Sequence, residues 1–314
     1  MKAIQINKFG GPEVMEFIDI AEPTPKSDEV LLDVTSIGIN YADTHQTENS
    51  YLSPQTLPFI PGLEITGTVA GKRFLAAVSG GYAQKAVANK QMLFPIPDGV
   101  TDNQALCMLV QGATAWHILK TVGHVKPGES VLIHAAAGGV GSIAIQLAKL
   151  WGAKVIAVAS SDEKRKLALQ LGADVAIDAN VDNLKIEILK ANSGAPVDLI
   201  LEMVGGKTTD ISLEVLAPFG RMIVYGAASR TAAQVIHPTS LMGGSKTVTG
   251  FWLAHCFGNK QLLNDVINEL FNLVATGKLK PIVGATFPLS QAAAAHSEML
   301  ARKTVGKIAL DPAG

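Results

Sequence analysis

The residues with the clearest chemistry are the glycines of the run 131–141, VLIHAAAGGVG. An apolar stretch leads into a glycine-rich turn, and apolar side chains then recur at helical spacing. In the G-x-G-x-x-G pattern of dinucleotide-binding turns, Ala136 takes the first glycine place, Gly138 the second and Gly141 the third. Gly138 lets backbone approach a pyrophosphate, Gly141 lets the helix pack on the strand, and the helix N-terminus attracts phosphate. The run therefore predicts a dinucleotide site, with a purely structural turn as the alternative.

The end of the next strand indicates which dinucleotide is bound. NAD-binding folds carry an acidic residue about 20 residues beyond the turn, but here that place holds Ala159, followed by Ser160 and, further on, Lys164. No carboxylate stands there to repel a 2′-phosphate, Ser160 can donate a hydrogen bond and Lys164 is positive, so NADP is favoured. The alternatives are that Ser160 caps the next helix, with Glu163 completing a capping box, and that Lys164 lies on a solvated helix face.

Two patterns of expected secondary structure surround these residues. From about residue 109, strands are expected at 131–135, 154–158, 175–177, 198–202 and 221–225, with helices near 140–151, 162–171, 183–191 and 208–216. This alternation predicts βαβ units and a parallel sheet, hence the α/β class. Before it, short strands are expected at 3–6, 29–37, 64–69 and 73–77, broken by turns. After it come a helix at 259–276 and a strand–helix–strand tail at 282–287, 291–300 and 306–310.

Composition excludes several classes of protein. The 26 basic and 27 acidic residues give a net charge of −1, which argues against a nucleic-acid partner. Hydrophobic residues make up 48% of the chain and support a sizeable core. Cys107 and Cys256 are too few for a four-cysteine zinc lobe. Because neither a signal peptide nor a spanning segment is evident, we expect a cytoplasmic protein without membrane contact.

Motifs along the whole chain resemble the medium-chain dehydrogenase/reductase superfamily, and within it the zinc-free NADPH:quinone oxidoreductases. They are GINYAD at 38–43, PGLE at 61–64, GGYA at 80–83, QGAT at 111–114, KPG at 126–128, the glycine turn at 135–141 and RKTVG at 302–306. The resemblance implies a GroES-like β-rich catalytic domain from 1–110, completed by 277–314. It also implies a doubly wound Rossmann domain that binds NADP at 111–276.

The resemblance also assigns the reaction site. Zinc enzymes of the superfamily carry a cysteine where this chain has Asn40 and a histidine where it has Leu63, so no metal is expected. Asn40 is expected to face the nicotinamide and Tyr51 to lie near the substrate carbonyl, which makes them the candidate catalytic residues. The alternatives are that Asn40 caps the segment before Asp43 and that Tyr51 is a packed loop aromatic. Many quinone reductases have a tyrosine in place of His45, which is not expected to act as an acid.

For the cofactor, the resemblance assigns the 2′-phosphate to Ser160, Lys164 and Arg302. Plain core packing is the alternative for Phe251 and Trp252. The full set of expected cofactor-binding residues is Gln111, Thr114, Ala136, Gly138, Gly139, Val140, Gly141, Ser160, Lys164, Tyr225, Gly226, Phe251, Trp252 and Arg302.

The resulting hypothesis is an NADPH-dependent reductase that transfers hydride to a quinone or related α,β-unsaturated carbonyl without zinc. An enoyl-thioester or alkenal reductase of the same superfamily, or an NADPH-binding protein without enzymatic activity, remain the alternatives. A homodimer is expected through the uncharged, β-rich run 247–253. One departure from the family lies at 70–72, where relatives carry a longer turn, and it leaves the shape of the substrate cleft open.

Overall fold

The computed structural model describes all 314 residues, which fold into two compact units. The terminal unit comprises residues 1–111 and 256–314, and the central unit comprises residues 112–255. Both ends of the chain therefore build the same unit. The units change at 255/256, whereas the expected Rossmann domain runs to 276, so helix α8 (Lys260–Ala275) belongs to the terminal unit.

The central unit contains a six-stranded sheet in which every neighbouring pair is parallel. The strands stand in the order β10-β9-β8-β11-β12-β13, the doubly wound arrangement of a Rossmann fold. The strands are β8 (Ser130–Ile133), β9 (Lys154–Ala159), β10 (Val175–Asp178), β11 (Val197–Glu202), β12 (Leu216–Val224) and β13 (Thr247–Gly250). The helices are α3 (Ala113–Leu119), α4 (Gly139–Leu150), α5 (Asp162–Gln170), α6 (Leu184–Ala191) and α7 (Lys207–Glu214).

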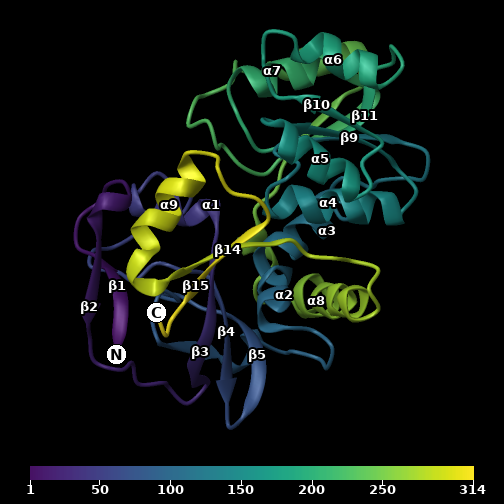
Figure 1. Cartoon of the computed structure of the whole chain (residues 1–314). Helices are drawn as coiled ribbons and strands as arrows, with labels where there is room; N and C mark the ends of the chain where they lie inside the picture. Colours follow the sequence, from purple (N-terminus) through teal and green to yellow (C-terminus); the bar gives the residue numbers. More distant parts are fainter. The chain divides into compact units, whose positions relative to one another are not determined.

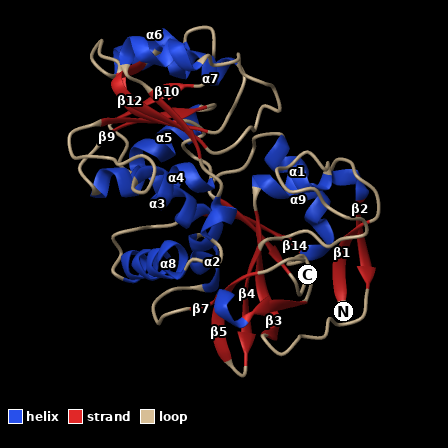
Figure 2. Ribbon diagram, turned by 180° about the vertical axis from the view of Figure 1, so that it is seen from behind, coloured by secondary structure: helices blue, strands red, loops and turns tan.

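Helices cover both faces of this sheet. Figure 2 shows α6 and α7 on one side of the strands and α3, α4 and α5 on the other. A strand covered on both faces is apolar along its whole length, and β8 accordingly has all four residues buried. Leu132, Ile156 and Ile200 of three neighbouring strands are in the core beneath α6 and α7.

The terminal unit is built on a mostly antiparallel sheet of seven strands. Its order is β14-β15-β3-β4-β5-β7, with β6 also paired to β3, and β1 and β2 form a separate antiparallel pair. The strands are β1 (Lys2–Ile6), β2 (Met15–Asp19), β3 (Glu29–Ile39), β4 (Glu64–Val69), β5 (Lys72–Ala77), β6 (Lys85–Asn89), β7 (Leu93–Pro95), β14 (Val283–Pro288) and β15 (Lys307–Asp311). The remaining helices are α1 (Tyr41–Thr47), α2 (Asp102–Leu106) and α9 (Ala292–Leu300), and a π-helical turn spans Met108–Gly112.

The last strand of the chain completes this sheet. In β15, Ile308, Ala309 and Leu310 pair with the end of β3, and β15 separates β3 from β14. Figure 1 shows the C-terminal strand running beside β3. Ile37 and Ile39 of β3 are fully buried, so the two chain ends share one core.

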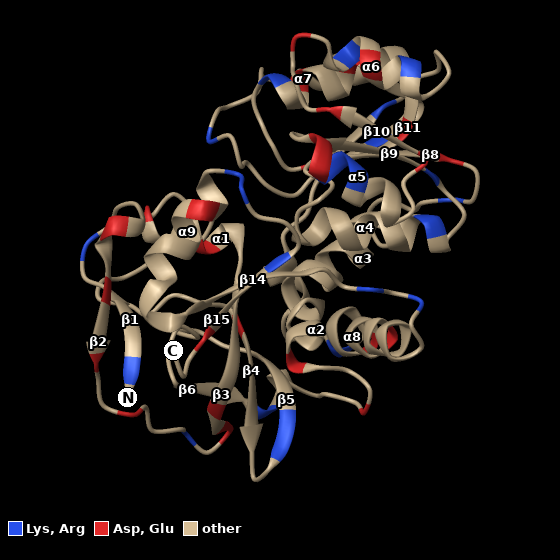
Figure 3. Ribbon diagram, viewed as in Figure 1, with Lys and Arg blue, Asp and Glu red and all other residues tan.

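Several elements differ from the expected ones. The helix expected at 208–216 ends at Glu214, because Leu216 already begins β12. Strands β2, β6 and β7 and helices α1, α2 and α3 were not expected at all. No helix is both long and apolar enough to cross a bilayer. Charges of both signs are interspersed on each unit (Figure 3).

Candidate functional site

The glycine turn that connects β8 to α4 leaves very little room for side chains. A Cβ atom placed on Gly141 would lie 2.5 Å from the carbonyl oxygen of Ala135 and 2.7 Å from Cα of Ala136. Both neighbours are backbone atoms, so only a glycine lets α4 approach the turn this closely. A Cβ on Gly138 would lie 3.1 Å from the Ala135 oxygen, a tighter contact than usual.

The turn is tied to the sheet by backbone hydrogen bonds. Ala136 N donates to Val158 O of β9 at 3.0 Å, and Gly138 N donates to Ala135 O at 2.9 Å. Ala135, rather than Ala136 at the first glycine place, takes the left-handed conformation, with φ +49°. Helix α4 begins at Gly139, and the first N–H groups of a helix have no acceptor within it. They form a ready phosphate-binding site.

Helix α5 is not capped by Ser160, the residue that the sequence offered as its alternative N-cap. The N-cap is Ser161, whose hydroxyl accepts a hydrogen bond from Lys164 N at 3.3 Å. Ser160 is exposed, and its hydroxyl is not the cap, so that alternative is wrong. Ser160 directly follows Ala159, the last residue of β9. Lys164 is half-buried in the first turn of α5.

A second basic side chain at this strand end went unnoticed in the sequence. The Arg165 guanidinium donates to Ala159 O at 3.1 Å and forms ion pairs with Asp162 and Asp178. Arg165 therefore joins the end of β9 to β10. The sequence signal was a basic residue one position beyond Lys164 and three beyond Asp162, but its partner Asp178 on β10 could not be inferred.

The other candidates of the central unit follow β12 and β13. Tyr225 N donates to Glu202 O at 2.9 Å, and burial raises the pKa of the Tyr225 phenol above its usual value. Gly226 follows it. Phe251 comes directly after β13, and its ring stacks on His117 of α3 with centroids 5.6 Å apart. Trp252 contacts the His255 ring edge-on at 5.3 Å. The stacking on buried His117 supports the core-packing alternative for Phe251.

These positions share one edge of the sheet. The glycine turn follows β8, Ser160 follows β9, Tyr225 follows β12 and Phe251 follows β13. In open α/β sheets, ligands bind at the carboxyl ends of the strands. The central unit therefore gathers these four positions at the edge where such a sheet binds its ligands.

Gln111 contributes a polar atom that needs a partner. It belongs to the π-helical turn Met108–Gly112, and the residue is 8% exposed. Its Oε1 is buried without a hydrogen-bond partner, a situation that costs free energy until a donor is supplied. A ribose hydroxyl or a carboxamide N–H would supply one. Thr114, three residues on, is buried in α3.

Asn40 belongs to a buried polar cluster in the terminal unit. It occupies the N-cap position of α1. Its Nδ2 donates to Glu64 Oε1 at 2.8 Å, and its Oδ1 accepts from Lys307 Nζ at 2.9 Å. Lys307 and Glu64 also form an ion pair in which neither side chain is exposed. Glu64 lies in one of the sequence motifs and Lys307 directly follows another, yet neither was assigned a role.

A second set of contacts holds the backbone of Asn40. Asn40 N donates to Asp43 Oδ2 at 2.8 Å. This backbone contact agrees with the alternative that Asn40 caps the segment before Asp43. Tyr82 Oη donates to the same oxygen at 2.9 Å and lies 2.9 Å from His296 Nε2. Burial raises the pKa of Asp43 to about 6, against the opposing effect of these hydrogen bonds, and lowers the pKa of His296 to about 4.

Tyr51 lies in an aromatic row after α1. Its ring stacks on that of His45 with centroids 6.2 Å apart, and Tyr41 meets the His45 ring edge-on at 5.7 Å. His45 Nδ1 lies 3.0 Å from Ser50 Oγ. Tyr51 is half-buried, so its ring belongs to a partly open surface of the terminal unit. Asn40, Tyr51, Gln111 and exposed Arg302 belong to this unit, and the other candidates belong to the central one.

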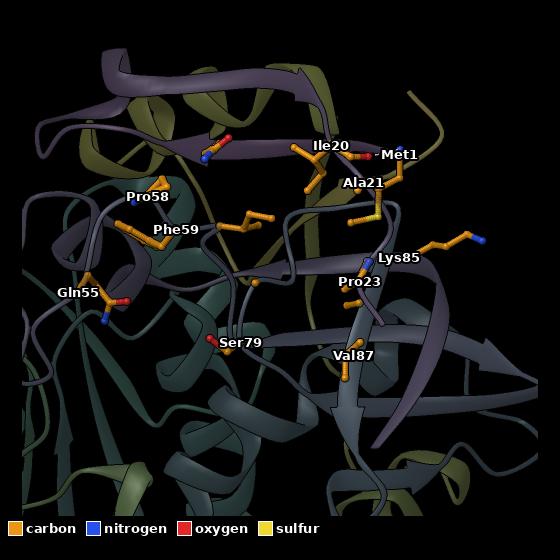
Figure 4. Close-up of a pocket in the computed structure, with 14 residues that line it drawn as sticks. Met1, Ile20, Ala21, Pro23, Gln55, Pro58, Phe59, Ser79, Lys85 and Val87 are labelled. Atoms are coloured by element: carbon orange, nitrogen blue, oxygen red, sulfur yellow. Dashed lines mark hydrogen bonds between the residues drawn. The ribbon is translucent and has the colours of Figure 1, made fainter. Parts of the chain in front are cut away.

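Two cavities of the terminal unit lie apart from these residues. Figure 4 shows one of about 390 Å³ in the terminal unit, between the start of the chain, the Pro58–Phe59 segment and β6. Another of about 540 Å³ is lined by Leu63, Ala77 and Phe257 among others. Neither is lined by a predicted catalytic or cofactor-binding residue. No three His, Cys, Asp or Glu side chains are grouped so that they could hold a metal ion.

A β-rich unit built from both chain ends and a Rossmann unit with a glycine turn define a two-domain oxidoreductase of the medium-chain dehydrogenase/reductase class. Residues 26–73 match the alcohol dehydrogenase GroES-like domain, and residues 139–272 match the zinc-binding dehydrogenase family. A quinone oxidoreductase of Pseudomonas aeruginosa is 34% identical, with 99% of each chain covered. That of Mus musculus is 31% identical, with 96% of this chain and 94% of the relative covered. The chain belongs to the quinone oxidoreductase family of this superfamily.

Solved structures agree with this membership. The quinone oxidoreductase of Thermus thermophilus, solved alone and with NADPH, has a TM-score of 0.90 at 37% identity, covering 99% of this chain and all of that one. The Escherichia coli quinone oxidoreductase complexed with NADPH has a TM-score of 0.92 at 31% identity, with the same coverage.

Proposed function

We propose that the protein is an NADPH-dependent, metal-independent reductase that transfers hydride to a quinone or a related α,β-unsaturated carbonyl compound. One observation carries the proposal. The β8–α4 turn brings α4 so close to Ala135 and Ala136 that Gly141 has no room for a side chain, in a chain whose full-length relatives are quinone oxidoreductases. This turn is the feature that pyrophosphate binding requires.

Preference for NADPH over NADH is supported by the residues after β9. Ser160 is exposed while Ser161 caps α5, so the Ser160 hydroxyl is not needed by the helix. Lys164 supplies a cation in the first turn of the same helix. We assign both, and by family resemblance Arg302, to the 2′-phosphate. Gln111, with its unpartnered Oε1, is assigned to the nicotinamide end.

Independence of zinc is supported by the chemistry of three side chains. The amide of Asn40 and the alkyl group of Leu63 are poor replacements for the thiolate and imidazole that zinc prefers. The Lys307 ammonium lies 2.9 Å from Asn40 Oδ1. Because a buried ammonium repels a second cation, it disfavours a metal ion beside Asn40.

In the mechanism, NADPH supplies the hydride, and the chain supplies position and hydrogen bonds. The turn and Lys164 would hold the phosphates, and Gln111 would orient the reacting end. Asn40 shapes the nicotinamide side of the pocket. Tyr51 donates a hydrogen bond to the acceptor's carbonyl oxygen as negative charge develops there. Holding donor and acceptor at reacting distance accounts for most of the rate.

We also infer a homodimer and a cytoplasmic location. Strand β13 ends the central sheet and is paired on one side only, by β12. An unprotected edge of this kind is an association hazard unless another chain covers it. The two free, buried cysteines fit a reducing compartment. Light scattering that gives the 32.9 kDa of a single chain would refute the dimer.

The function is tested by following NADPH oxidation with a panel of quinones, alkenals and a crotonyl thioester, with a chelator present throughout. The proposal predicts turnover with quinones or simple enones. Faster turnover of the crotonyl thioester would instead identify an enoyl-thioester reductase. NADPH binding without oxidation by any acceptor would indicate a protein without this enzymatic activity.

A further inference from the structure

A single buried carboxylate connects two parts of the proposed site. Glu64 Oε1 accepts a hydrogen bond from Asn40 Nδ2 at 2.8 Å, and its Oε2 accepts one from Val110 N at 2.9 Å. Val110 belongs to the same π-helical turn as Gln111. Glu64 therefore contacts the candidate catalytic amide with one oxygen and the Gln111 segment with the other.

Lys307 fixes the orientation of this arrangement. An amide side chain presents nearly the same shape in its two flipped states, but a carboxylate only accepts hydrogen bonds and an ammonium only donates them. With Glu64 at Nδ2 and Lys307 at Oδ1, only one of the two states of Asn40 is satisfied. The ion pair therefore determines which end of the amide faces each neighbour.

The backbone makes room for this pair. A Cβ atom on Gly38 of β3 would lie 2.7 Å from Glu64 Cγ and 2.8 Å from both Glu64 Oε1 and Lys307 Cε. Gly38 has no positive φ that would by itself require glycine. The small residue is explained by the two side chains that pass over it.

Stability alone is a poor explanation for the pair. Removing two charges from water is costly, and well-packed apolar residues are often as stabilising as a buried ion pair. Here both side chains are completely buried. A role in orientation accounts for charges that the fold does not require.

We propose that Lys307 and Glu64 are positioning residues for hydride transfer, which act by fixing the Asn40 amide and, through Val110 N–H, the turn that carries Gln111. This inference rests on the proposed function. It assigns a role to Lys307 of β15, a residue that lies outside every motif of the cofactor site.

The test is the double variant Glu64→Gln/Lys307→Met. It removes both charges together and so avoids leaving one uncompensated. The amide introduced at position 64 both donates and accepts, so it satisfies Asn40 in either flipped state. In single-turnover mixing of NADPH with a quinone, we expect hydride transfer to slow roughly 10–100-fold, as small misplacements do. The NADPH dissociation constant should change much less than this rate.

The control is Glu129→Gln/Arg221→Met. This pair lies in the central unit with its side chains 18% and 16% exposed. The other hydrogen bonds of these side chains are with Lys126, Gly123 and His124, none of them a proposed site residue. We expect it to lower thermal stability without slowing hydride transfer. If Glu64→Gln/Lys307→Met does not fold, Gly38→Ala displaces the same pair while keeping its charges and should slow the same step.

Hydrogen exchange of the protein without cofactor gives a readout that is independent of activity. Loss of the Glu64 carboxylate should speed exchange of Val110 N–H about tenfold or more, whereas the control variant should not. A folded double variant with the wild-type rate of hydride transfer, or with unchanged exchange at Val110, overturns the inference and leaves the proposed function intact. Absence of hydride transfer in the wild-type protein rejects the function itself, and the positioning role with it.

Discussion

The substitution Gly141→Ala adds one methyl group where the structure has no space for it. The new Cβ would lie 2.5 Å from Ala135 O, and 2.7 and 2.8 Å from Cα and O of Ala136. Ordinary contacts begin near 3.4 Å, so α4 or the turn must move by roughly 1 Å, at a cost of about 1–3 kcal/mol for overpacking. Because all three neighbours are backbone atoms, no side chain can rotate away to relieve the contact.

We expect two measurable losses from Gly141→Ala. The free energy of unfolding of the central unit, measured by urea titration, should fall by about 1–3 kcal/mol. The N–H groups at the start of α4 move with the helix, and one lost hydrogen bond to a phosphate costs about 1.5–3 kcal/mol. The NADPH dissociation constant, measured by fluorescence titration, should therefore rise roughly 10–100-fold.

Two matched variants separate these effects. Gly138→Ala places its Cβ 3.1 Å from Ala135 O and should weaken NADPH binding with a smaller loss of stability. Gly243→Ala meets no atom within 4 Å and should change neither quantity. If Gly141→Ala binds NADPH as tightly as the wild type, the β8–α4 turn is not the phosphate site and the reasoning is refuted.

Further predictions concern single groups. Lys164→Ala should weaken NADPH about tenfold and NADH hardly at all; equal losses in a binding titration would contradict the 2′-phosphate assignment. Tyr51→Phe should slow enone reduction about fivefold, quinone reduction less, and leave NADPH affinity unchanged; a mainly weaker NADPH affinity would make Tyr51 a packing residue. Burial lowers the pKa of His134 from 6.5 to about 4, so the folded state binds fewer protons than the unfolded one in this range and stability falls as pH drops from 6.5 towards 4. In His134→Asn, the fall in the free energy of unfolding over this pH range should be about 3 kcal/mol smaller, as measured by urea titration at several pH values. An unchanged pH dependence would refute this prediction. Elemental analysis should find no stoichiometric zinc, and zinc together with chelator-sensitive turnover would overturn metal independence.

Local patterns predicted the central unit well, because its strands are buried on both faces and its helices are amphipathic. In the terminal unit, β4 matched the expected range 64–69 to the residue, and in the central unit α5 began at Asp162 as expected. The helix expected at 208–216 ran too far because apolar Leu216 fits helical spacing equally well. Short edge elements such as β7, with three residues, carry too little pattern to be recognised.

The sequence pointed to candidate site residues only where their chemistry is local. The glycine turn lies within eleven consecutive residues, whereas Lys307 and Glu64 are 243 positions apart and meet only because β15 inserts beside β3. A lysine at the start of the apolar run KIAL of β15 was the available signal, since a lysine is almost never fully buried without a partner. The sequence offered Ser160 as the cap of α5, and the structure has Ser161 in that place. This shift of one residue is within the normal uncertainty of helix ends.

The most direct test of the account is a single-turnover reaction of the purified protein with NADPH deuterated at C4 and a simple quinone, in the presence of a chelator. We expect one hydroquinone formed per NADPH consumed, a slower reaction with the deuterated position than with the protonated one, and no effect of the chelator. Failure to oxidise NADPH with any quinone or enone, or loss of the reaction on chelation, would contradict it.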